Sequence, residues 1–337
     1  MNDLSIEHGR SIDVLCLGRA GVDLYAAEEN TDITEVASFK KFVGGSPANI
    51  AVSLARLGGR AAIISVVSND GLGRYVVDYL NQQGIDIKAV RFDASGARTS
   101  LAITEMKPTE GEVVLYRNRA ADLQLSMDDI QLDHIAQAKI LLVSGTALSK
   151  SPSREATLLA IEHARSVNTF VVLDLDYRAY SWASEQEASL YYQIAARASN
   201  VIIGNLEEIN ILSTHASLEY DMQPNKLEAF LKPYFQGVAE LIIVKRGEDG
   251  SQAFTKDGRC LKQGIYPVSV KKPFGAGDAF AGTLIHGLIK GLDIETCIRR
   301  GSAAAAINVS RDSCTEAMLS LTELLSFMAR NEQTKFK

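Results

Sequence analysis

Short apolar runs rich in Val, Ile and Leu alternate with helical patterns along almost the whole chain, and this alternation limits the possible folds more than any other feature. The apolar runs are at 12–17, 61–67, 140–143, 170–175, 201–203 and 241–244. Helical spacing is found at 47–57, 72–83, 153–166, 185–198, 225–235, 293–309 and 315–330. Such runs suit strands that are covered on both faces. The pattern therefore predicts an α/β fold with a mostly parallel sheet and helices on both sides.

Two segments, at about 23–43 and 98–118, interrupt this alternation. In the second, apolar and polar residues alternate on either side of a turn at 108–111, which is typical of an antiparallel hairpin. The chain returns to the α/β pattern after each segment. We therefore predict one domain, residues 10–330, with a small inserted β lid that could exclude water from a cleft.

The composition excludes several classes of protein. With 46% hydrophobic and 23% charged residues, neither a disordered nor a fibrous chain is indicated. A net charge of −6 without a long basic cluster argues against nucleic acid or an anionic membrane as partner. The four cysteines have no Cys-x-x-Cys spacing, so free thiols are expected. The polar start and the lack of long apolar windows predict a cytoplasmic protein.

The segment 272–280, Lys-Pro-Phe-Gly-Ala-Gly-Asp-Ala-Phe, is predicted to open a helix. Residues 264–270 suggest a strand, and residues 279–290 have helical spacing. Gly275, Ala276 and Gly277 would leave the helix N-terminus open to an anion, because its first N–H groups lack partners and carry the positive end of the dipole. Asp278 could accept a proton from an attacking hydroxyl. A tight turn or close helix packing is the structural alternative.

A second glycine motif, Gly44-Gly45-Ser46-Pro47-Ala48-Asn49, precedes the helical pattern at 47–57. Ser46 as N-cap and Pro47 at the first helical position are explained by helix initiation alone. The two glycines and Asn49 are not. An amide that both donates and accepts hydrogen bonds would suit recognition of a polyol.

Charged residues follow two of the predicted strands. Asp174, Asp176 and Arg178 come after the predicted strand at 170–173, at the strand end where open α/β sheets bind ligands; a salt-bridged loop is the alternative. Asn205 and Glu208 follow the next strand. Acidic residues there could simply favour a helix start, or a carboxylate could organise Mg²⁺ through water.

A third glycine segment, from Lys245 to Gly250, leaves the run at 241–244. It is compatible with an ordinary turn into a hairpin. With a nucleotide present, Gly247 and Gly250 would let the backbone approach phosphate or ribose.

Taken in order, these motifs resemble the ribokinase-like, or PfkB, family of carbohydrate kinases, over residues 12–325. The resemblance implies a three-layer α/β sandwich with a mostly parallel central sheet and a small β lid. It also implies magnesium-dependent transfer of phosphate from ATP to an alcohol group. A non-catalytic sugar or nucleotide sensor is the alternative from another class.

The resemblance assigns roles to matching residues only. It implies that Asp278 is the catalytic base, with an anion hole formed by Gly275, Ala276 and Gly277. Sugar-binding positions would be Asp23, Gly44, Gly45 and Asn49. Nucleotide and phosphate would meet Asn205, Lys245, Gly247, Gly250 and the late-helix residues Ser302, Ala305 and Asn308. Glu208 would hold Mg²⁺ through water.

One departure from the family concerns the monovalent cation. Many members have Asp-Thr before the Gly-Ala-Gly-Asp motif and bind such a cation there, whereas this chain has Lys272-Pro273. A lysine cannot serve as that ligand. We hypothesise that the Lys272 ammonium replaces the charge of the cation.

Three strings, at 115–122, 174–182 and 272–274, resemble family members that act on sugar acids. The resemblance implies phosphorylation of the terminal (6-) hydroxyl of 5-dehydro-2-deoxy-D-gluconate in myo-inositol catabolism, with 2-keto-3-deoxygluconate kinase or fructokinase activity as alternatives. Arg117 and Arg178 could clamp a carboxylate, or could instead pair with Asp122, Asp174 or Asp176. Exposed lid strands could also pair across a homodimer.

Overall fold

The computed structural model describes residues 4–109, 111–212, 224–332 and 334, so Glu110 in the predicted lid turn lies outside the described residues. The large sheet contains β1 (Ile12–Leu17), β4 (Ala61–Ser68), β5 (Asp86–Asp93), β8 (Ala138–Ser144), β9 (Phe170–Asp174), β10 (Val201–Asn205), β11 (Leu241–Lys245), β12 (Ser251–Thr255) and β13 (Cys260–Gln263). Their order is β13-β12-β11-β10-β9-β8-β1-β4-β5. Pairing is parallel from β11 to β5 and antiparallel at β12 and β13. The predicted mostly parallel sheet is confirmed.

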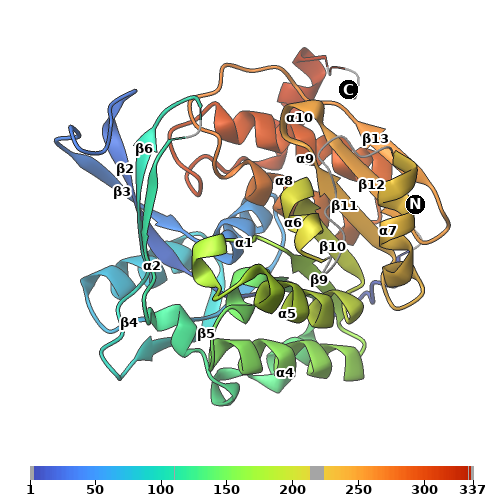
Figure 1. Cartoon of the computed structure of the whole chain (residues 1–337), viewed down its shortest axis with the longest axis horizontal. Helices are drawn as coiled ribbons and strands as arrows, with labels where there is room; N and C mark the ends of the chain where they lie inside the picture. Colours follow the sequence, from blue (N-terminus) through green and yellow to red (C-terminus); the bar gives the residue numbers. More distant parts are fainter. Residues whose placement is uncertain (1–3, 110, 213–223, 333, 335–337) are drawn as a thin grey trace.

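Helices cover both faces of this sheet (Figure 1). One face packs against α1 (Ser46–Arg56), α2 (Gly71–Gln82), α8 (Ala276–Ile289), α9 (Ile294–Val309) and α10 (Leu321–Arg330). The other packs against α3 (Leu132–Gln137), α4 (Ser153–Ser166), α5 (Glu185–Arg197), α6 (Leu206–Ile211) and α7 (Pro224–Phe235). Side chains of β1 alternate between these layers, with Val14 in one core and Leu15 in the other. Burial on both faces explains why the strands are continuous apolar runs.

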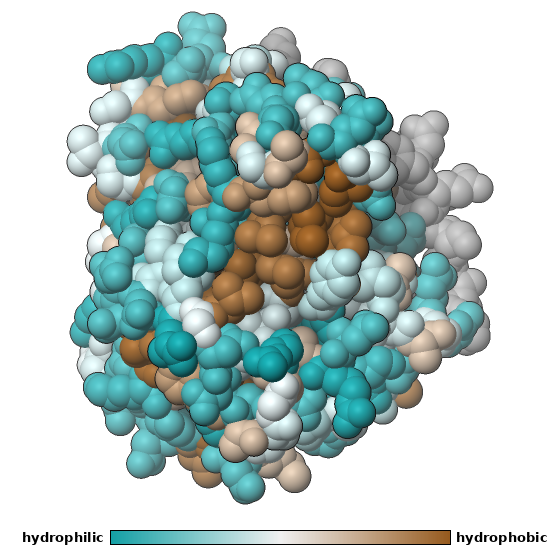
Figure 2. All heavy atoms as spheres, turned by 90° about the vertical axis from the view of Figure 1, so that its left-hand side faces the viewer, coloured by the Kyte–Doolittle hydropathy of each residue, from teal (hydrophilic) through white to brown (hydrophobic). Residues whose placement is uncertain are grey.

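The lid is a separate sheet of β2 (Gly21–Glu29), β3 (Phe39–Gly44), β6 (Leu101–Met106) and β7 (Val113–Tyr116), in the order β3-β2-β6-β7. It projects from one side of the large sheet (Figure 1). Its inner face carries Tyr25, whose ring lies 5.1 Å from that of Phe274. Because side chains alternate along a strand, Leu24, Ile103 and Val114, which are paired in register, lie on the opposite face. Apolar surface gathers on this side of the molecule (Figure 2).

The chain changes direction between β1 and β8. From β1 it passes through the lid to α1, β4 and β5, and then returns to β8 on the other side of β1. In open α/β sheets, ligands bind beyond the carboxyl ends of the strands where such a reversal occurs. The residues after β1 and β8 are therefore in the favoured place for a site.

Three sequence expectations need correction. Residues 264–270 do not form a strand, because the neighbouring strand β12 begins at Ser251, which already pairs with Gln263 and leaves the next residues without a partner. The last helix begins at Leu321 rather than residue 315, since Ser320 and Glu323 form its capping box. The edge strand β5 was not predicted.

Within the described residues, no helix combines the length and apolar character needed to cross a bilayer.

Candidate active site

The N-terminus of α8 is open, as the glycine motif predicted. Helix α8 begins at Ala276, three residues before the predicted start, and no side chain of the described residues caps it. Gly275 has φ of 86°, a left-handed conformation that favours glycine. A Cβ on Gly275 would lie 2.6 Å from Cys314 Sγ and 2.7 Å from Asn308 Oδ1. This position therefore requires glycine for both its backbone conformation and its close packing.

Asp278 lies in the first turn of α8 and is partly exposed. Asn49 Nδ2 donates a hydrogen bond of 2.6 Å to Asp278 Oδ2, which joins the start of α8 to the first turn of α1. Burial and the nearby Asp176 carboxylate raise the pKa of Asp278, although Asn49 and Lys245 favour its charged form. A carboxylate with a raised pKa at a helix N-terminus can act as a general base.

The paired glycines before α1 bring the lid strand against the body. A Cβ on Gly44 would lie 2.1 Å from Asp23 Oδ2, and one on Gly45 would lie 2.4 Å from the Arg19 carbonyl oxygen. Both residues must therefore be glycine if Asp23 and Arg19 are to keep these positions. Helix initiation alone did not explain these two glycines, and this close approach does.

Three buried oxygen atoms at this edge of the sheet have no hydrogen-bond partner among the described residues. They are Asp23 Oδ1, Asn49 Oδ1 and Asp174 Oδ1. An unpartnered buried acceptor is costly unless a ligand or water satisfies it. Acceptors grouped in this way fit a ligand with several hydroxyl groups.

Carboxylates and one lysine gather at the ends of β9, β10 and β11. Lys245 Nζ lies 3.6 Å from Asp174 Oδ1, and a Cβ on Gly277 would lie 3.1 Å from the same Nζ. Burial raises the pKa of Asp174 and of Glu208, while the positive charge of Lys245 acts to lower both pKa values. The Lys245 ammonium thus lies beside the open start of α8.

Glu208 accepts a hydrogen bond of 2.7 Å from the backbone N–H of Asn205, and Asn205 Oδ1 accepts one of 2.8 Å from Glu208 N–H. This reciprocal capping box explains both residues structurally. Among the described residues, no three His, Cys, Asp or Glu side chains are grouped to hold a metal ion. One or two carboxylates with water and phosphate oxygens is the usual way in which Mg²⁺ is held, and Glu208 with Asp174 fits that arrangement.

The two arginines expected to clamp a carboxylate are differently placed. Arg117 is buried, and it donates to Asp122 Oδ2 at 2.9 and 2.7 Å and to the Thr146 carbonyl at 3.1 Å. The pairing with Asp122 given as the alternative is therefore the one observed. Arg178 is exposed and lies 2.9 Å from Asp176 Oδ1. Neither guanidinium is without an anionic partner.

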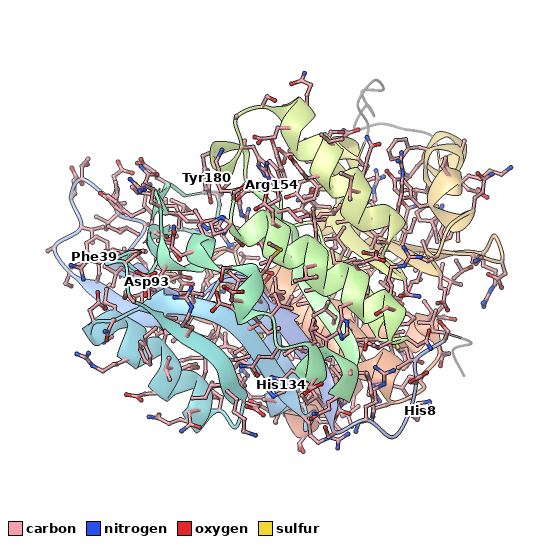
Figure 3. All side chains as sticks on the ribbon, turned by 90° about the horizontal axis from the view of Figure 1, so that it is seen from below. His8, Phe39, Asp93, His134, Arg154 and Tyr180 are labelled. Carbon is pink, nitrogen blue, oxygen red and sulfur yellow. The ribbon has the colours of Figure 1, made fainter. Side chains whose placement is uncertain are left out.

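The loop that carries Arg178 is held by aromatic packing behind it. Trp182 packs against Tyr192, with ring centroids 5.3 Å apart. Arg154 lies over the Tyr191 ring at 3.8 Å. Figure 3 shows Arg154 and Tyr180, which belongs to the same loop, on the same side of the molecule. The loop end at Trp182 is thus fixed, while Tyr180 is exposed.

The residues predicted to contact the nucleotide differ in how accessible they are. Gly247 has φ of 56° with open space around it, whereas a Cβ on Gly250 would lie 2.1 Å from the Gln263 carbonyl. Ser302 donates to the Gly264 carbonyl at 2.8 Å. Ala305 is partly exposed, but Asn308 is fully buried. Asn308 therefore faces the protein interior in this structure and not a surface where adenine would lie.

Lys272 is one of the most buried charged residues, with 0% exposure. Its Nζ donates to the Phe274 carbonyl at 2.7 Å and to Asn308 Oδ1 at 2.9 Å. Burial lowers the pKa of Lys272, while Cys314, Asp278 and Asp23 act to raise it. This ammonium therefore contacts the loop that precedes α8, where the anion hole was predicted.

Some neighbours of the site were not identified from the sequence. Tyr25 hydroxyl lies 3.1 Å from Asp23 Oδ2 and 3.0 Å from Cys314 Sγ. Arg19 lies between Gly21, Gly45 and Ser100. No local motif marks these residues, although Arg19 directly follows a predicted strand.

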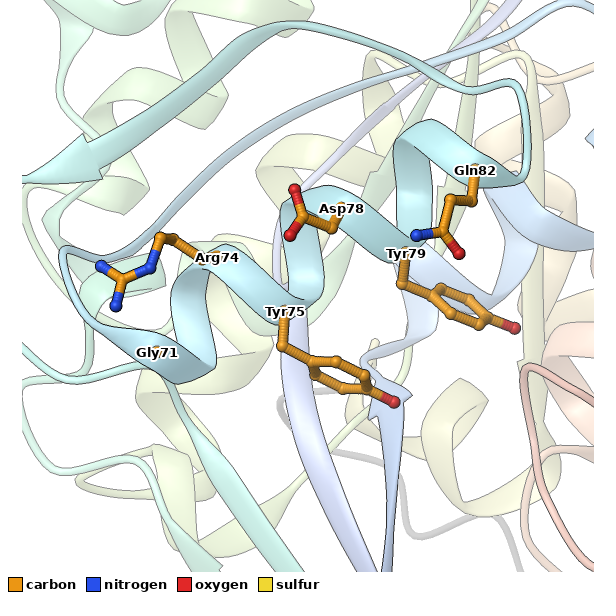
Figure 4. Close-up of a pocket in the computed structure, with 6 residues that line it drawn as sticks. All are labelled: Gly71, Arg74, Tyr75, Asp78, Tyr79 and Gln82. Carbon is orange, nitrogen blue, oxygen red and sulfur yellow. The ribbon is translucent and has the colours of Figure 1, made fainter.

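A shallow pocket also lies on the outer surface of α2 (Figure 4). It is lined by Gly71, Arg74, Tyr75, Asp78, Tyr79 and Gln82. Tyr75 hydroxyl donates to the Lys41 carbonyl at 3.3 Å, and Lys41 Nζ lies 3.8 Å above the Tyr75 ring. These contacts join α2 to the lid strand β3, and no residue of the pocket belongs to the groups around Asp278.

Comparison with known sequences gives a consistent picture. Residues 11–321 match the family described as pfkB family carbohydrate kinase. A 5-dehydro-2-deoxygluconokinase from Photobacterium profundum is 50% identical over 333 residues, which cover 99% of both chains. The 5-dehydro-2-deoxygluconokinase 1 of a Bacillus cereus strain is 43% identical over 334 residues, again covering 99% of each.

Solved structures agree with the fold. A fructokinase double mutant from Vibrio cholerae O395, with fructose, ADP and potassium ion bound, superposes with a TM-score of 0.83 at 25% identity, covering 95% of this chain and 100% of that one. A putative ribokinase II from E. coli, in complex with ATP and Mg²⁺, gives 0.83 at 21% identity, covering 95% and 99%. The predicted ribokinase-like architecture is confirmed.

Proposed function

The chain belongs to the pfkB family of carbohydrate kinases, and we propose that it phosphorylates the 6-hydroxyl of 5-dehydro-2-deoxy-D-gluconate with ATP, in myo-inositol catabolism. The observation that carries the proposal is the position of Asp278 in the first turn of α8, whose N-terminus has no side-chain cap. Asn49 donates to Asp278, and Asn49 Oδ1 and Asp23 Oδ1 are buried acceptors without a partner among the described residues. The 50% identity to a 5-dehydro-2-deoxygluconokinase over 99% of both chains is the reason for proposing this sugar as the substrate. Because the reaction consumes ATP, we also propose that it takes place in the cytoplasm.

In the proposed reaction, the 6-hydroxyl oxygen attacks the γ-phosphorus and the bond to the β-phosphate oxygen of ATP breaks. The hydroxyl proton passes to the Asp278 carboxylate. The N–H groups of Gly275, Ala276 and Gly277 stabilise the negative charge on the transferred group, since helix N-termini favour anions. Asn49 keeps the Asp278 carboxylate in position through its hydrogen bond of 2.6 Å. Catalysis then depends mainly on positioning and electrostatics.

The phosphates of ATP are proposed to lie between α8 and the ends of β10 and β11. Lys245 would contribute its positive charge beside Gly277, and Gly247 would let the backbone approach the nucleotide. Arg246 Nε is buried without a partner among the described residues, which adds an available donor in this segment. Mg²⁺, held by Glu208 through water and near Asp174, would neutralise phosphate charge.

A coupled assay of ADP formation tests the proposed substrate. With equal concentrations of 5-dehydro-2-deoxygluconate, 2-keto-3-deoxygluconate, fructose, ribose and adenosine, we expect kcat/KM to be highest for the first, by about 10-fold or more, since one well-placed polar contact is typically worth that much. Higher activity on 2-keto-3-deoxygluconate or fructose would replace the proposed substrate. Binding of sugar without ADP formation from any compound would favour the sensor.

We further propose that Lys272 takes the place of a monovalent cation. The fructokinase from V. cholerae O395 was solved with a potassium ion, whereas here a buried ammonium contacts the Phe274 carbonyl next to the anion hole. A fixed charge at this position would make the activity independent of potassium.

The outer face of the lid is proposed to pair with a second copy of the chain. Leu24, Ile103 and Val114 share this face, and Tyr116, on the same face at the lid edge, is 60% exposed. Apolar residues grouped on an exposed sheet favour association.

Replacing Ile103 by Glu should therefore convert a dimer into a monomer. Sedimentation velocity would show the expected halving of mass. Leu132→Glu, the same type of change on α3, is the control and should leave the mass unchanged. A wild-type protein that sediments as a monomer at micromolar concentration would contradict the dimer.

A further inference from the structure

Arg19 is a cation of the site that forms no direct ion pair among the described residues, although carboxylates lie near it. It follows β1, next to the direction change between β1 and β8. Within the described ranges its guanidinium makes one long hydrogen bond, 3.3 Å from Nη1 to Ser100 Oγ, and no ion pair within 4.0 Å. The other two arginines are occupied, Arg117 by Asp122 and Arg178 by Asp176. Arg19 thus has donors available for a ligand.

Glycines create the space that Arg19 occupies. A Cβ on Gly21 would lie 3.0 Å from Arg19 Nη1, and one on Gly45 would lie 3.4 Å from Arg19 Cγ and 2.4 Å from its carbonyl oxygen. Gly45 also has φ of 104°, where glycine is favoured. A side chain at position 45 would force the Arg19 backbone to move, whereas one at position 21 would first meet Ser100 Oγ at 2.6 Å. The neighbouring glycines therefore leave room for Arg19 in a position where it can bind a ligand.

Nearby carboxylates keep Arg19 in its charged form. Burial acts to lower the pKa of Arg19, but the carboxylates of Asp23, Asp122 and Asp176 outweigh it and raise that pKa. Arg19 is consequently charged at every working pH. Asp122 and Asp176 already pair with other arginines, and Asp23 accepts from Tyr25. The Arg19 guanidinium itself, however, has no carboxylate in direct contact, and this place is left for the ligand.

A row of groups links Arg19 to the proposed base. Asp23 lies against Gly44, and Arg19 lies against Gly45. One helical turn beyond these glycines, Asn49 donates to Asp278. The unpartnered oxygens Asp23 Oδ1 and Asn49 Oδ1 lie along this row. A ligand with an anionic end, several hydroxyl groups and a terminal hydroxyl would have a partner for each of these groups.

We propose that Arg19 binds the carboxylate of the sugar acid and so sets the preference for acidic over neutral sugars. The inference rests on the proposed function, in which the opposite end of the same sugar is phosphorylated. It assigns the carboxylate to a residue after β1 and not to Arg117, whose guanidinium is buried against Asp122 and the Thr146 carbonyl. Guanidinium and carboxylate match in charge and in planar geometry.

The test compares acid and neutral substrates in the variant Arg19→Gln. The ratio of kcat/KM for 5-dehydro-2-deoxygluconate to that for fructose should fall by about 10- to 100-fold, the usual loss for a charge-assisted hydrogen bond. Most of the loss should be in KM for the acid, and Arg19→Lys should recover part of it. Arg259→Gln, the same change in an exposed ion pair with Asp257 at the far turn of β12, is the control and should leave the ratio unchanged.

Two results would overturn the inference. One is an unchanged ratio in Arg19→Gln; the other is a ratio lost in Arg178→Gln and kept in Arg19→Gln, which would assign the carboxylate to Arg178. Calorimetric titration with D-gluconate and D-glucitol, which differ only at the carboxylate carbon, separates this question from turnover. Gluconate should bind more tightly to wild type, and Arg19→Gln should remove the difference. If no sugar acid is phosphorylated, the proposed function fails, but gluconate binding still tests the role of Arg19. Gluconate binding that is undetectable, or that is unaltered in Arg19→Gln, counts against this role.

Discussion

Replacing Asp278 by Asn should lower kcat by about 10²-fold or more, in the usual range for loss of a general base. The amide cannot accept the hydroxyl proton. Its size is nearly that of the carboxylate, so the first turn of α8 and the neighbouring Asn49 should stay in place. KM for the sugar and the Kd for ATP should change little. Steady-state kinetics with calorimetric binding of ATP measures both quantities.

The pH profile gives an independent check on Asp278. Its base form is lost as the pH falls through its pKa, which burial and the Asp176 charge raise above the ordinary aspartate value. The acid limb of kcat should therefore lie above the pH range of a free carboxylate and disappear in Asp278→Asn. Asp257→Asn, the same change on an exposed turn, should leave turnover and profile intact. Near-normal turnover in Asp278→Asn would exclude this residue as the base.

The fold was largely predictable because its signal is local. Buried parallel strands such as β1 and β8 are apolar along their whole length, and this pattern is visible without any knowledge of their neighbours. The strand β5 was missed since it is an edge strand in which Asp86, Lys88, Arg91 and Asp93 face solvent or ion pairs. The segment 264–270 was assigned wrongly because an apolar run forms a strand only if a partner is present.

The placement of a candidate site residue was predictable where that residue follows a strand or opens a helix. Asn49, Asp278, Asn205 and Glu208 occupy such positions. Contacts between distant segments were not predictable. Tyr25 and Cys314 are 289 residues apart in sequence and still approach within 3.0 Å. The pairing of Arg117 with Asp122 depends on burial that no local pattern reveals, which is why the sequence left it as one of two alternatives.

Lys272 fixes the direction of a peptide group in the proposed anion hole. In a trans peptide the carbonyl and the N–H point in opposite directions. Lys272 Nζ holds the Phe274 carbonyl at 2.7 Å, so the N–H of Gly275, in the same peptide plane, is directed away from the lysine. A second bond, to Asn308 Oδ1 at 2.9 Å, fixes the ammonium to α9. The charge and the orientation of the proposed anion hole thus depend on one side chain.

Replacing Lys272 by Met should lower kcat by about 10²-fold, because it leaves two buried acceptors unpaired and removes a charge beside the transferred phosphoryl group. Wild-type activity should not change when potassium replaces choline in the buffer. In the smaller variant Lys272→Ala, potassium or ammonium ions should restore part of the lost kcat by occupying the vacated space. Lys271→Met is the control, since Lys271 is an exposed neighbour paired with Asp312, and its kcat should be unchanged. Thermal unfolding of each variant separates lost turnover from lost folding. Strong potassium activation of the wild type would show that Lys272 does not replace a cation.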